Sequence, residues 1–127
     1  MIRLFVVADD FTGALDTGVQ LASFGASTKV VAGLDLAAID PADDAQVLVV
    51  DAETRHLAPK AAYDTVYHLV RWAVEQGVQC VYKKTDSALR GNIGAELAAA
   101  LEASGRQAIH FVPAFPQMDR VTEGRCV

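Results

Sequence analysis

The chain has 127 residues, of which 52% are hydrophobic and 21% charged, and its formal net charge is −5. These values are typical of one globular domain with its own core and exclude an intrinsically disordered chain. Lysine and arginine form no cluster, so we expect no nucleic-acid surface. No apolar run approaches the ~20 residues that cross a bilayer, so we expect no membrane partner. The two cysteines, Cys80 and Cys126, and the three scattered histidines have no metal-ligand spacing, and we expect no metal site and a cytoplasmic protein.

Apolar runs alternate with helical patterns along the chain. Five runs have the length and the polar flanks of buried strands, and Cys80 within one of them is expected to be a buried free thiol. These runs lie at residues 2–8, 27–33, 46–52, 79–84 and 107–115. Helices are expected over 12–25, from Pro59 to a stop at Gly77, and over 93–105, with a short helical turn within 34–45.

Strands that alternate with helices predict an α/β fold. We expect a parallel, or mostly parallel, sheet of about five strands with helices on both faces. The last residues, "VTEGRCV", form no closing helix, whereas a doubly wound sheet commonly continues beyond this point. We therefore expect residues 1–127 to form a domain that is incomplete at its C-terminal end.

Polar residues follow the predicted strands at the points where ligands bind in open α/β sheets. Asp9 and Asp10 follow the first strand, 51–55 follow the third, and 83–90 follow the fourth. Two adjacent carboxylates can bind a hydroxylated substrate, hold a metal ion or share a proton. Equally, Asp10 can cap the next helix while Asp9 faces solvent.

The densest group of polar residues is "KKTDSALRGN", residues 83–92. Lysine and arginine bind carboxylates or phosphates, serine and threonine add neutral hydrogen bonds, and glycine allows a ligand to approach the backbone. The alternative is a solvated turn in which Asn92 caps the following helix. Arg55, in "DAETRHL", is equally interpretable as a carboxylate ligand or as a surface residue. The chain has neither a Walker A loop nor a GxGxxG motif.

Three segments together carry a family resemblance: "ADDFTGALDTGVQLA", "VYKKTDSALRGNIGAEL" and "VPAFPQMDR". In this order and spacing they resemble the N-terminal domain of the four-carbon acid sugar kinases. That family was long described as a domain of unknown function, and some members carry the label of a Hrp-dependent type III effector or outer protein. One departure is Asp119, which stands where the family pattern has glycine.

The resemblance implies a kinase that phosphorylates threonate, erythronate or a 3-oxo-tetronate. It implies an N-terminal domain that binds the acid sugar and a C-terminal domain, in cis, that holds ATP and Mg²⁺. The ATP site would lie outside this chain, so residues 1–127 alone are expected to be inactive. Asp10 and Asp86 are the expected catalytic candidates. The substrate site is expected to contain Asp9, Asp10, Arg55, Lys84, Asp86, Ser87, Arg90 and Gly91.

Two other classes of function compete with this interpretation. A phosphoacceptor receiver domain also has acids after its first strand and an aspartate after its third, where Asp51 lies. However, its lysine follows the fifth strand, whereas Lys83 and Lys84 follow the fourth. A secreted effector or interaction protein is the other alternative, and the compact alternating core argues against it.

Overall fold

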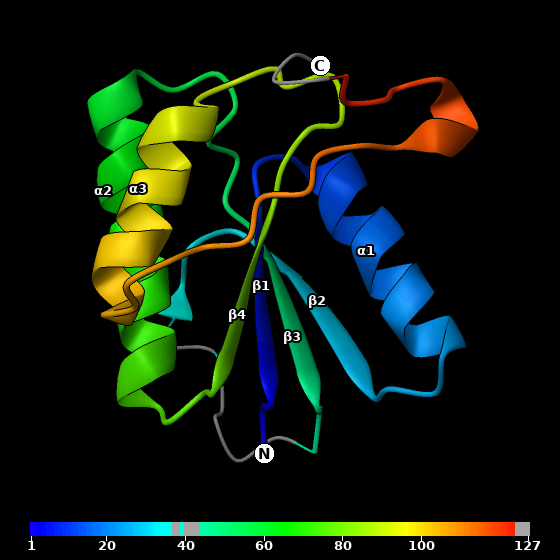
Figure 1. The fold of residues 1–127 in the computed structure, drawn as a ribbon. Coiled ribbons are helices and arrows are strands. Elements are labelled where there is room, and N and C mark those ends of the chain that lie inside the picture. Colours follow the sequence, from blue (N-terminus) through cyan, green and yellow to red (C-terminus); the bar gives the residue numbers. More distant parts are fainter. Residues whose placement is uncertain (37–38, 40–43, 124–127) are drawn as a thin grey trace.

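The computed structural model describes residues 1–36, 39 and 44–123. These residues form four strands and three α-helices, which alternate except that β3 follows β2 directly among the described elements, and a 3-10 helix comes last (Figure 1). The elements are β1 (Leu4–Ala8), α1 (Phe11–Ser23), β2 (Thr28–Ala32), β3 (Val47–Asp51), α2 (Pro59–Glu75), β4 (Cys80–Lys84), α3 (Ile93–Ser104) and η2 (Pro116–Met118). Half of the segment 34–45, within which a helical turn was predicted, lies outside the described residues.

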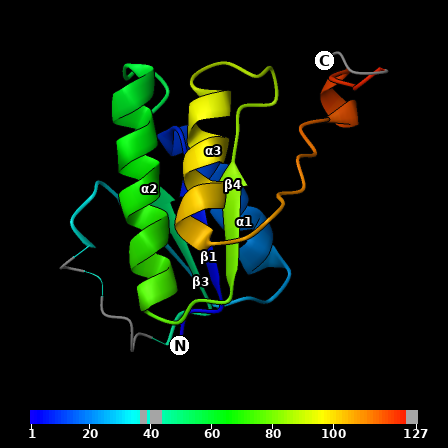
Figure 2. The same ribbon diagram turned by 60° about the vertical axis from the view of Figure 1, so that its left-hand side comes forward.

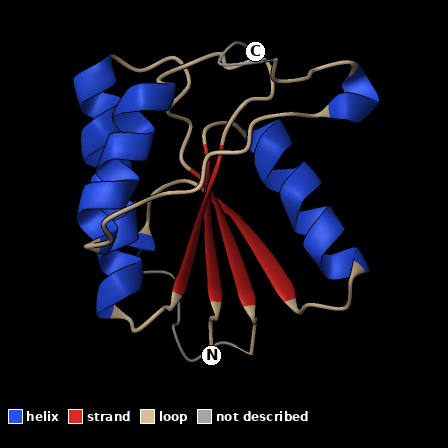
Figure 3. Ribbon diagram, viewed as in Figure 1, coloured by secondary structure: helices blue, strands red, loops and turns tan. Residues whose placement is uncertain are grey.

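The four strands form one parallel sheet with the order β2-β3-β1-β4 (Figure 3). The expectation of a parallel α/β sheet is therefore confirmed. The order differs from the 2-1-3-4-5 order of receiver domains, so the fold argues against the phosphoacceptor alternative. No helix among the described residues is long and apolar enough to cross a membrane.

Each face of the sheet has its own hydrophobic core because side chains alternate along a strand. Phe5 and Val7 of β1 face α2 and α3, whereas Val6 and Ala8 face α1. All four side chains are fully buried. Helices on both faces were predicted, and the two cores confirm that prediction.

The helix ends follow the sequence signals closely. Asp10 occupies the N-cap of α1, Pro59 begins α2, and Gly105 ends α3 with a φ of 66°. Glycine is favoured at that last position because the left-handed conformation strains other residues. The three predicted helices are confirmed to within about two residues at each end.

The predicted fifth strand at 107–115 is wrong. The described segment pairs with no strand and runs from α3 towards η2, away from the sheet (Figure 2). An apolar run becomes a strand only where it finds a hydrogen-bonding partner, and here a groove of about 790 Å³ separates the segment from β4. The sheet has four strands rather than about five, β4 is an edge strand, and Cys80 is exposed rather than buried.

Candidate functional site

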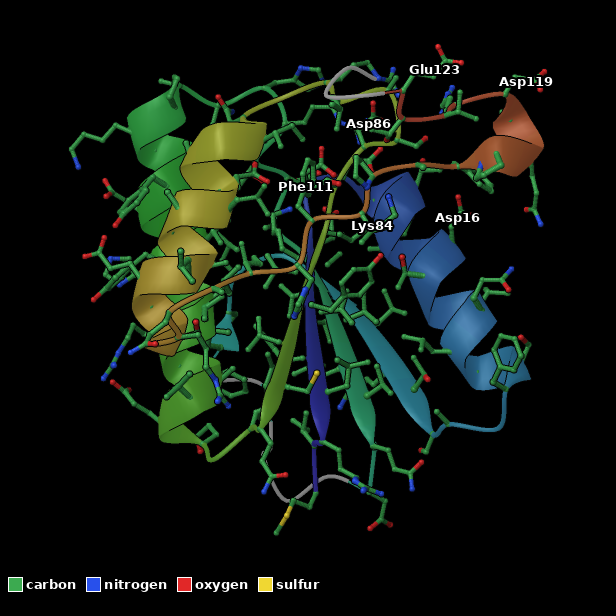
Figure 4. All side chains as sticks on the ribbon, viewed as in Figure 1. Asp16, Lys84, Asp86, Phe111, Asp119 and Glu123 are labelled. Atoms are coloured by element: carbon green, nitrogen blue, oxygen red, sulfur yellow. The ribbon has the colours of Figure 1, made fainter. Side chains whose placement is uncertain are left out.

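The connections that leave β1 and its two neighbouring strands lead to opposite faces of the sheet, and this creates a crevice at one edge of the sheet. β1 leads to α1 on one face, whereas its two neighbours, β3 and β4, lead to α2 and α3 on the other face. Ligands bind in open α/β sheets at such points, beyond the carboxyl ends of the strands. Figure 4 shows Lys84 and Asp86 at this edge.

Arg55 lies at the centre of the charged residues at this edge. Its Nε donates a 2.8 Å hydrogen bond to Asp9 Oδ2, and its Nη1 donates one of 2.8 Å to Asp10 Oδ2. Its Nη2 lies 3.6 Å from Asp86 Oδ1. Burial lowers the pKa of Arg55, but the hydrogen bond to Asp9 and the three carboxylate charges outweigh it and raise the pKa. Arg55 therefore stays protonated and joins loops that follow β1, β3 and β4.

Asp9 and Asp10 have different roles, although they are adjacent in sequence. Asp9 is only 1% exposed, so the alternative in which it faces solvent is wrong. Asp10 Oδ1 accepts a 2.9 Å hydrogen bond from the backbone N–H of Gly13, while its Oδ2 binds Arg55. Asp10 is therefore both the helix cap and a member of the charged group, and its side chain is 28% exposed.

Asp86 is held by Arg90 in a two-bond contact. Arg90 Nε donates to Asp86 Oδ2 over 2.9 Å, and Arg90 Nη2 donates to Asp86 Oδ1 over 2.8 Å. The backbone N–H groups of Ala88 and Arg90 also donate to Asp86 Oδ2. The Arg90 hydrogen bond, with these amides, holds the pKa of Asp86 well below its usual range. Asp86 is therefore ionised at neutral pH, while the Arg90 side chain remains 64% exposed.

Gly91 and Asn92, which follow Arg90, fix the position of its loop. Gly91 has a φ of 91°, and a Cβ there would lie 3.3 Å from Arg55 Cγ. The alternative of a solvated turn expected the Asn92 side chain to cap α3. The Asn92 side chain makes no such capping hydrogen bond. It donates instead to the carbonyls of Thr54 and Leu57 over 3.0 and 2.9 Å. The loops after β3 and β4 are therefore joined directly.

Lys83 and Lys84 point to opposite faces of β4, as neighbours in a strand do. Lys84 pairs in register with Ala8, on the α1 face, and its Nζ donates to the carbonyl of Thr85 over 2.5 Å. Lys83 pairs with Val7 and is buried against α3, where its Nζ lies 2.7 Å from Glu96 Oε2. Only Lys84 reaches the cleft described next.

A cleft of about 850 Å³ opens between α1, the loop after β4 and residues 112–120. Its lining is rich in charge of both signs and in hydroxyl groups. The polar lining residues include Asp10, Thr12, Asp16, Thr17, Arg55, Lys84, Thr85, Asp86, Ser87, Arg90 and Arg120. The cleft thus contains every predicted substrate-site residue except Asp9 and Gly91, which support Arg55 from outside the cleft.

Arg120 is a cleft residue that the sequence interpretation missed. Its guanidinium donates a hydrogen bond to the Ser87 hydroxyl, which brings the segment after η2 against the loop after β4. Asp119, next to it, has a φ of 54°. A positive φ is the conformation that glycine adopts most readily, and glycine is the residue that the sequence analysis expected at this position.

The carboxylates at this edge of the sheet do not form a metal site. Within the described ranges, no group of three or more His, Cys, Asp and Glu residues is arranged to hold a metal ion. Asp9, Asp10 and Asp86 are instead paired with Arg55 and Arg90. Their chemistry suits a ligand with its own anionic group and several hydroxyls.

The fold and the charged cleft define a small-molecule-binding α/β domain, and comparison with known proteins identifies its family. The family described as the sugar-binding N-terminal domain matches residues 4–127. The chain belongs to this family.

Several curated relatives are full-length kinases of four-carbon acid sugars by name. The chain is 44% identical to the D-threonate kinase of Salmonella typhimurium and 47% identical to that of Bordetella bronchiseptica, over 99% and 91% of its length. It is 34% identical to the D-erythronate kinase of Heliobacterium modesticaldum, over 98% of its length. The chain spans 30%, 29% and 28% of the length of these three relatives.

A crystal structure of a domain of unknown function from Bordetella bronchiseptica has a similar fold. That protein is a domain-swapped dimer with bound citrate. It superposes with a TM-score of 0.74 and is 42% identical, over 80% of this chain and 26% of that one.

Proposed function

We propose that residues 1–127 are the acid-sugar-binding part of an ATP-dependent kinase that phosphorylates threonate, erythronate or a 3-oxo-tetronate. The names of the relatives support this proposal, because the chain aligns over nearly its whole length with threonate and erythronate kinases. A kinase of this kind would act in the cytoplasm, where ATP is available.

The observation that carries the proposal is the pairing of an exposed cation with anchored carboxylates in one cleft. A four-carbon acid sugar has one carboxylate and several hydroxyls. Arg90 is exposed and suits the substrate carboxylate, and Lys84 adds a second positive charge. Asp10 can accept hydrogen bonds from sugar hydroxyls, and Ser87 can donate to a sugar oxygen.

Between the two catalytic candidates, we favour Asp10 over Asp86 as the base. Asp86 accepts hydrogen bonds from Arg90 and two backbone amides, and its low pKa makes it a poor proton acceptor. Asp10 is more exposed and lies at the start of α1, beside the cleft. Phosphoryl transfer depends mainly on positioning and charge, so Asp10 would chiefly orient the attacked hydroxyl.

ATP and Mg²⁺ are assigned to the C-terminal domain of the proposed kinase. Asp10 and Asp86 of the described cleft are paired with Arg55 and Arg90, so these two carboxylates do not fit a Mg²⁺ ion. No step of the proposal therefore places the metal among them. Their part is to bind and orient the acid sugar.

The test is a chimaera in which residues 1–127 replace the corresponding part of the Salmonella typhimurium D-threonate kinase. We expect ATP-dependent phosphorylation of at least one four-carbon acid sugar, measured as ADP release. The same chimaera with Arg90→Ala should lose that activity while it remains folded. A folded chimaera that phosphorylates none of D-threonate, D-erythronate and 3-oxo-tetronate would overturn the proposal.

A further inference from the structure

A second charged pair lies beneath the site and has no part in the proposed chemistry. Lys83 Nζ is 2.7 Å from Glu96 Oε2, and the side chains of both residues are only 1% exposed. Lys83 comes from β4 and Glu96 from the first turn of α3. Lys83 Nζ also donates a 2.8 Å hydrogen bond to the carbonyl of Lys84, the last residue of β4.

The burial of this ion pair between β4 and α3 costs desolvation free energy. Its surroundings are the apolar core that α2 and α3 form on the sheet, with Val7 and Ala99 fully buried nearby. Glu96 Oε1 has no hydrogen-bond partner. Apolar side chains of similar volume usually stabilise such a position at least as well as a buried ion pair. The stability of the core therefore does not explain why charges lie here.

The pair lies beside the strand that leads to the site. Lys83 is paired with Val7 in the sheet, and Asp9 follows directly after the last residue of β1. Burial lowers the pKa of Lys83, and the charges of Glu96 and Asp9 oppose that shift without cancelling it. Asp9 Oδ1 is buried without a hydrogen-bond partner, while Asp9 Oδ2 holds Arg55. Lys83 therefore lies between Glu96 of α3 and the strand that leads to Asp9, and Asp9 in turn holds Arg55.

We propose that Lys83 and Glu96 are positioning residues for Arg55. Their pair fixes the end of β4 through the Lys84 carbonyl and stabilises the buried charge of Asp9, which orients the Arg55 guanidinium. The consequence for acid-sugar binding rests on the proposed function, whereas the consequence for Arg55 does not.

The test replaces the whole pair with apolar residues, in the variant Lys83→Met with Glu96→Leu. This double variant leaves no uncompensated charge in the core, so we expect it to fold. The matched control is Lys60→Met with Asp64→Leu, which removes an exposed pair of the same 2.7 Å length on α2, in a different part of the chain. Two readouts are the ¹H–¹⁵N resonance of the Arg55 Nε–H group and the Kd for D-threonate from calorimetry.

In the double variant, we expect the Arg55 Nε–H resonance to move or broaden. We also expect the Kd for D-threonate to rise at least about tenfold, because the side chains of a binding site must be held within about 0.5 Å of their working positions. The control should change neither. A folded double variant with an unchanged Arg55 resonance would overturn the proposal. If the unaltered chain binds none of D-threonate, D-erythronate and 3-oxo-tetronate, the proposed function fails, and the Arg55 resonance alone decides the positioning role. If the double variant does not fold, the variant Glu96→Gln takes its place, because glutamine keeps the side-chain volume. The Arg55 Nε–H resonance should then move or broaden in Glu96→Gln, and an unchanged resonance would overturn the proposal.

Discussion

Arg55 and Arg90 are the same residue type, line the same cleft and both contact Asp86, yet their surroundings differ sharply. The Arg55 side chain is 13% exposed and reaches three carboxylates, whereas the Arg90 side chain is 64% exposed and is paired with one. A buried guanidinium with three anionic partners is committed to the protein. An exposed guanidinium with one partner keeps donors for a ligand. Arg55 therefore stabilises the structure of the site, and Arg90 is the better candidate to bind the substrate.

The largest expected effect is on stability, in the variant Arg55→Ala. This change leaves Asp9 buried without its cation, so the free energy of unfolding should fall by about 3–5 kcal/mol. Chemical denaturation measures it. Arg71→Ala is the control, since it removes only an exposed pair with Glu75 and should cost less than about 1 kcal/mol. Equal losses in both variants would show that Arg55 does not hold the site together.

The second expected effect separates binding from stability, in the variant Arg90→Ala. Asp86 keeps Arg55 and two backbone amides as partners when Arg90 is removed, so the unfolding midpoint should fall less than in Arg55→Ala. The Kd for the acid sugar should rise at least about thirtyfold, as expected when a charged partner of a ligand is lost. Calorimetry checks the affinity. Unchanged affinity in a folded variant would exclude Arg90 from the site and end the contrast with Arg55.

A smaller effect is expected where the two arginine loops touch, in the variant Gly91→Ala. The positive φ and the approach to Arg55 Cγ should cost about 1–2 kcal/mol of unfolding free energy. Gly94→Ala is the matched control, because a Cβ there meets nothing within 4 Å and alanine favours a helix. The prediction is contradicted if both alanines are equally well tolerated in thermal or chemical unfolding.

The smallest expected effect is a pH dependence that comes from Asp86. Its pKa is depressed in the folded chain, so its contribution to stability is complete above the pKa of an unfolded aspartate, about 3.9. That contribution is lost as the pH falls below about 4. Denaturation curves between pH 7 and pH 2 should therefore show a shallower decline for Asp86→Asn than for the unaltered chain. Parallel declines would mean that Arg90 does not hold the Asp86 carboxylate in solution.

The sequence predicted the parts of the fold that depend on local signals. Asp10, Pro59 and Gly105 are cap or terminator residues, and the structure confirms the helices that they delimit. Long-range pairing was less predictable. The apolar run at 107–115 has the composition of a strand, but composition does not reveal whether a partner edge lies within hydrogen-bonding distance.

The candidate site was predictable in its location but not in its internal connections. Strand ends of a parallel sheet share one edge, so the residues after them had to lie near one another. Arg55 links Asp9, Asp10 and Asp86. This connection depends on loop geometry, which no local sequence pattern encodes. One missed feature did have a signal. Lys83 and Lys84 are adjacent in a strand, so one of them had to face the core and needed a buried anion there.

Calorimetric titration of the chain with D-threonate, beside the uncharged polyol threitol, tests the central claim most directly. The two ligands share a four-carbon chain with hydroxyls and differ in the carboxylate that Arg90 is proposed to bind. The account predicts that D-threonate binds, that threitol binds far more weakly, and that Arg90→Ala abolishes the difference. Equal binding of both ligands, or a difference that persists in the Arg90→Ala variant, would contradict it.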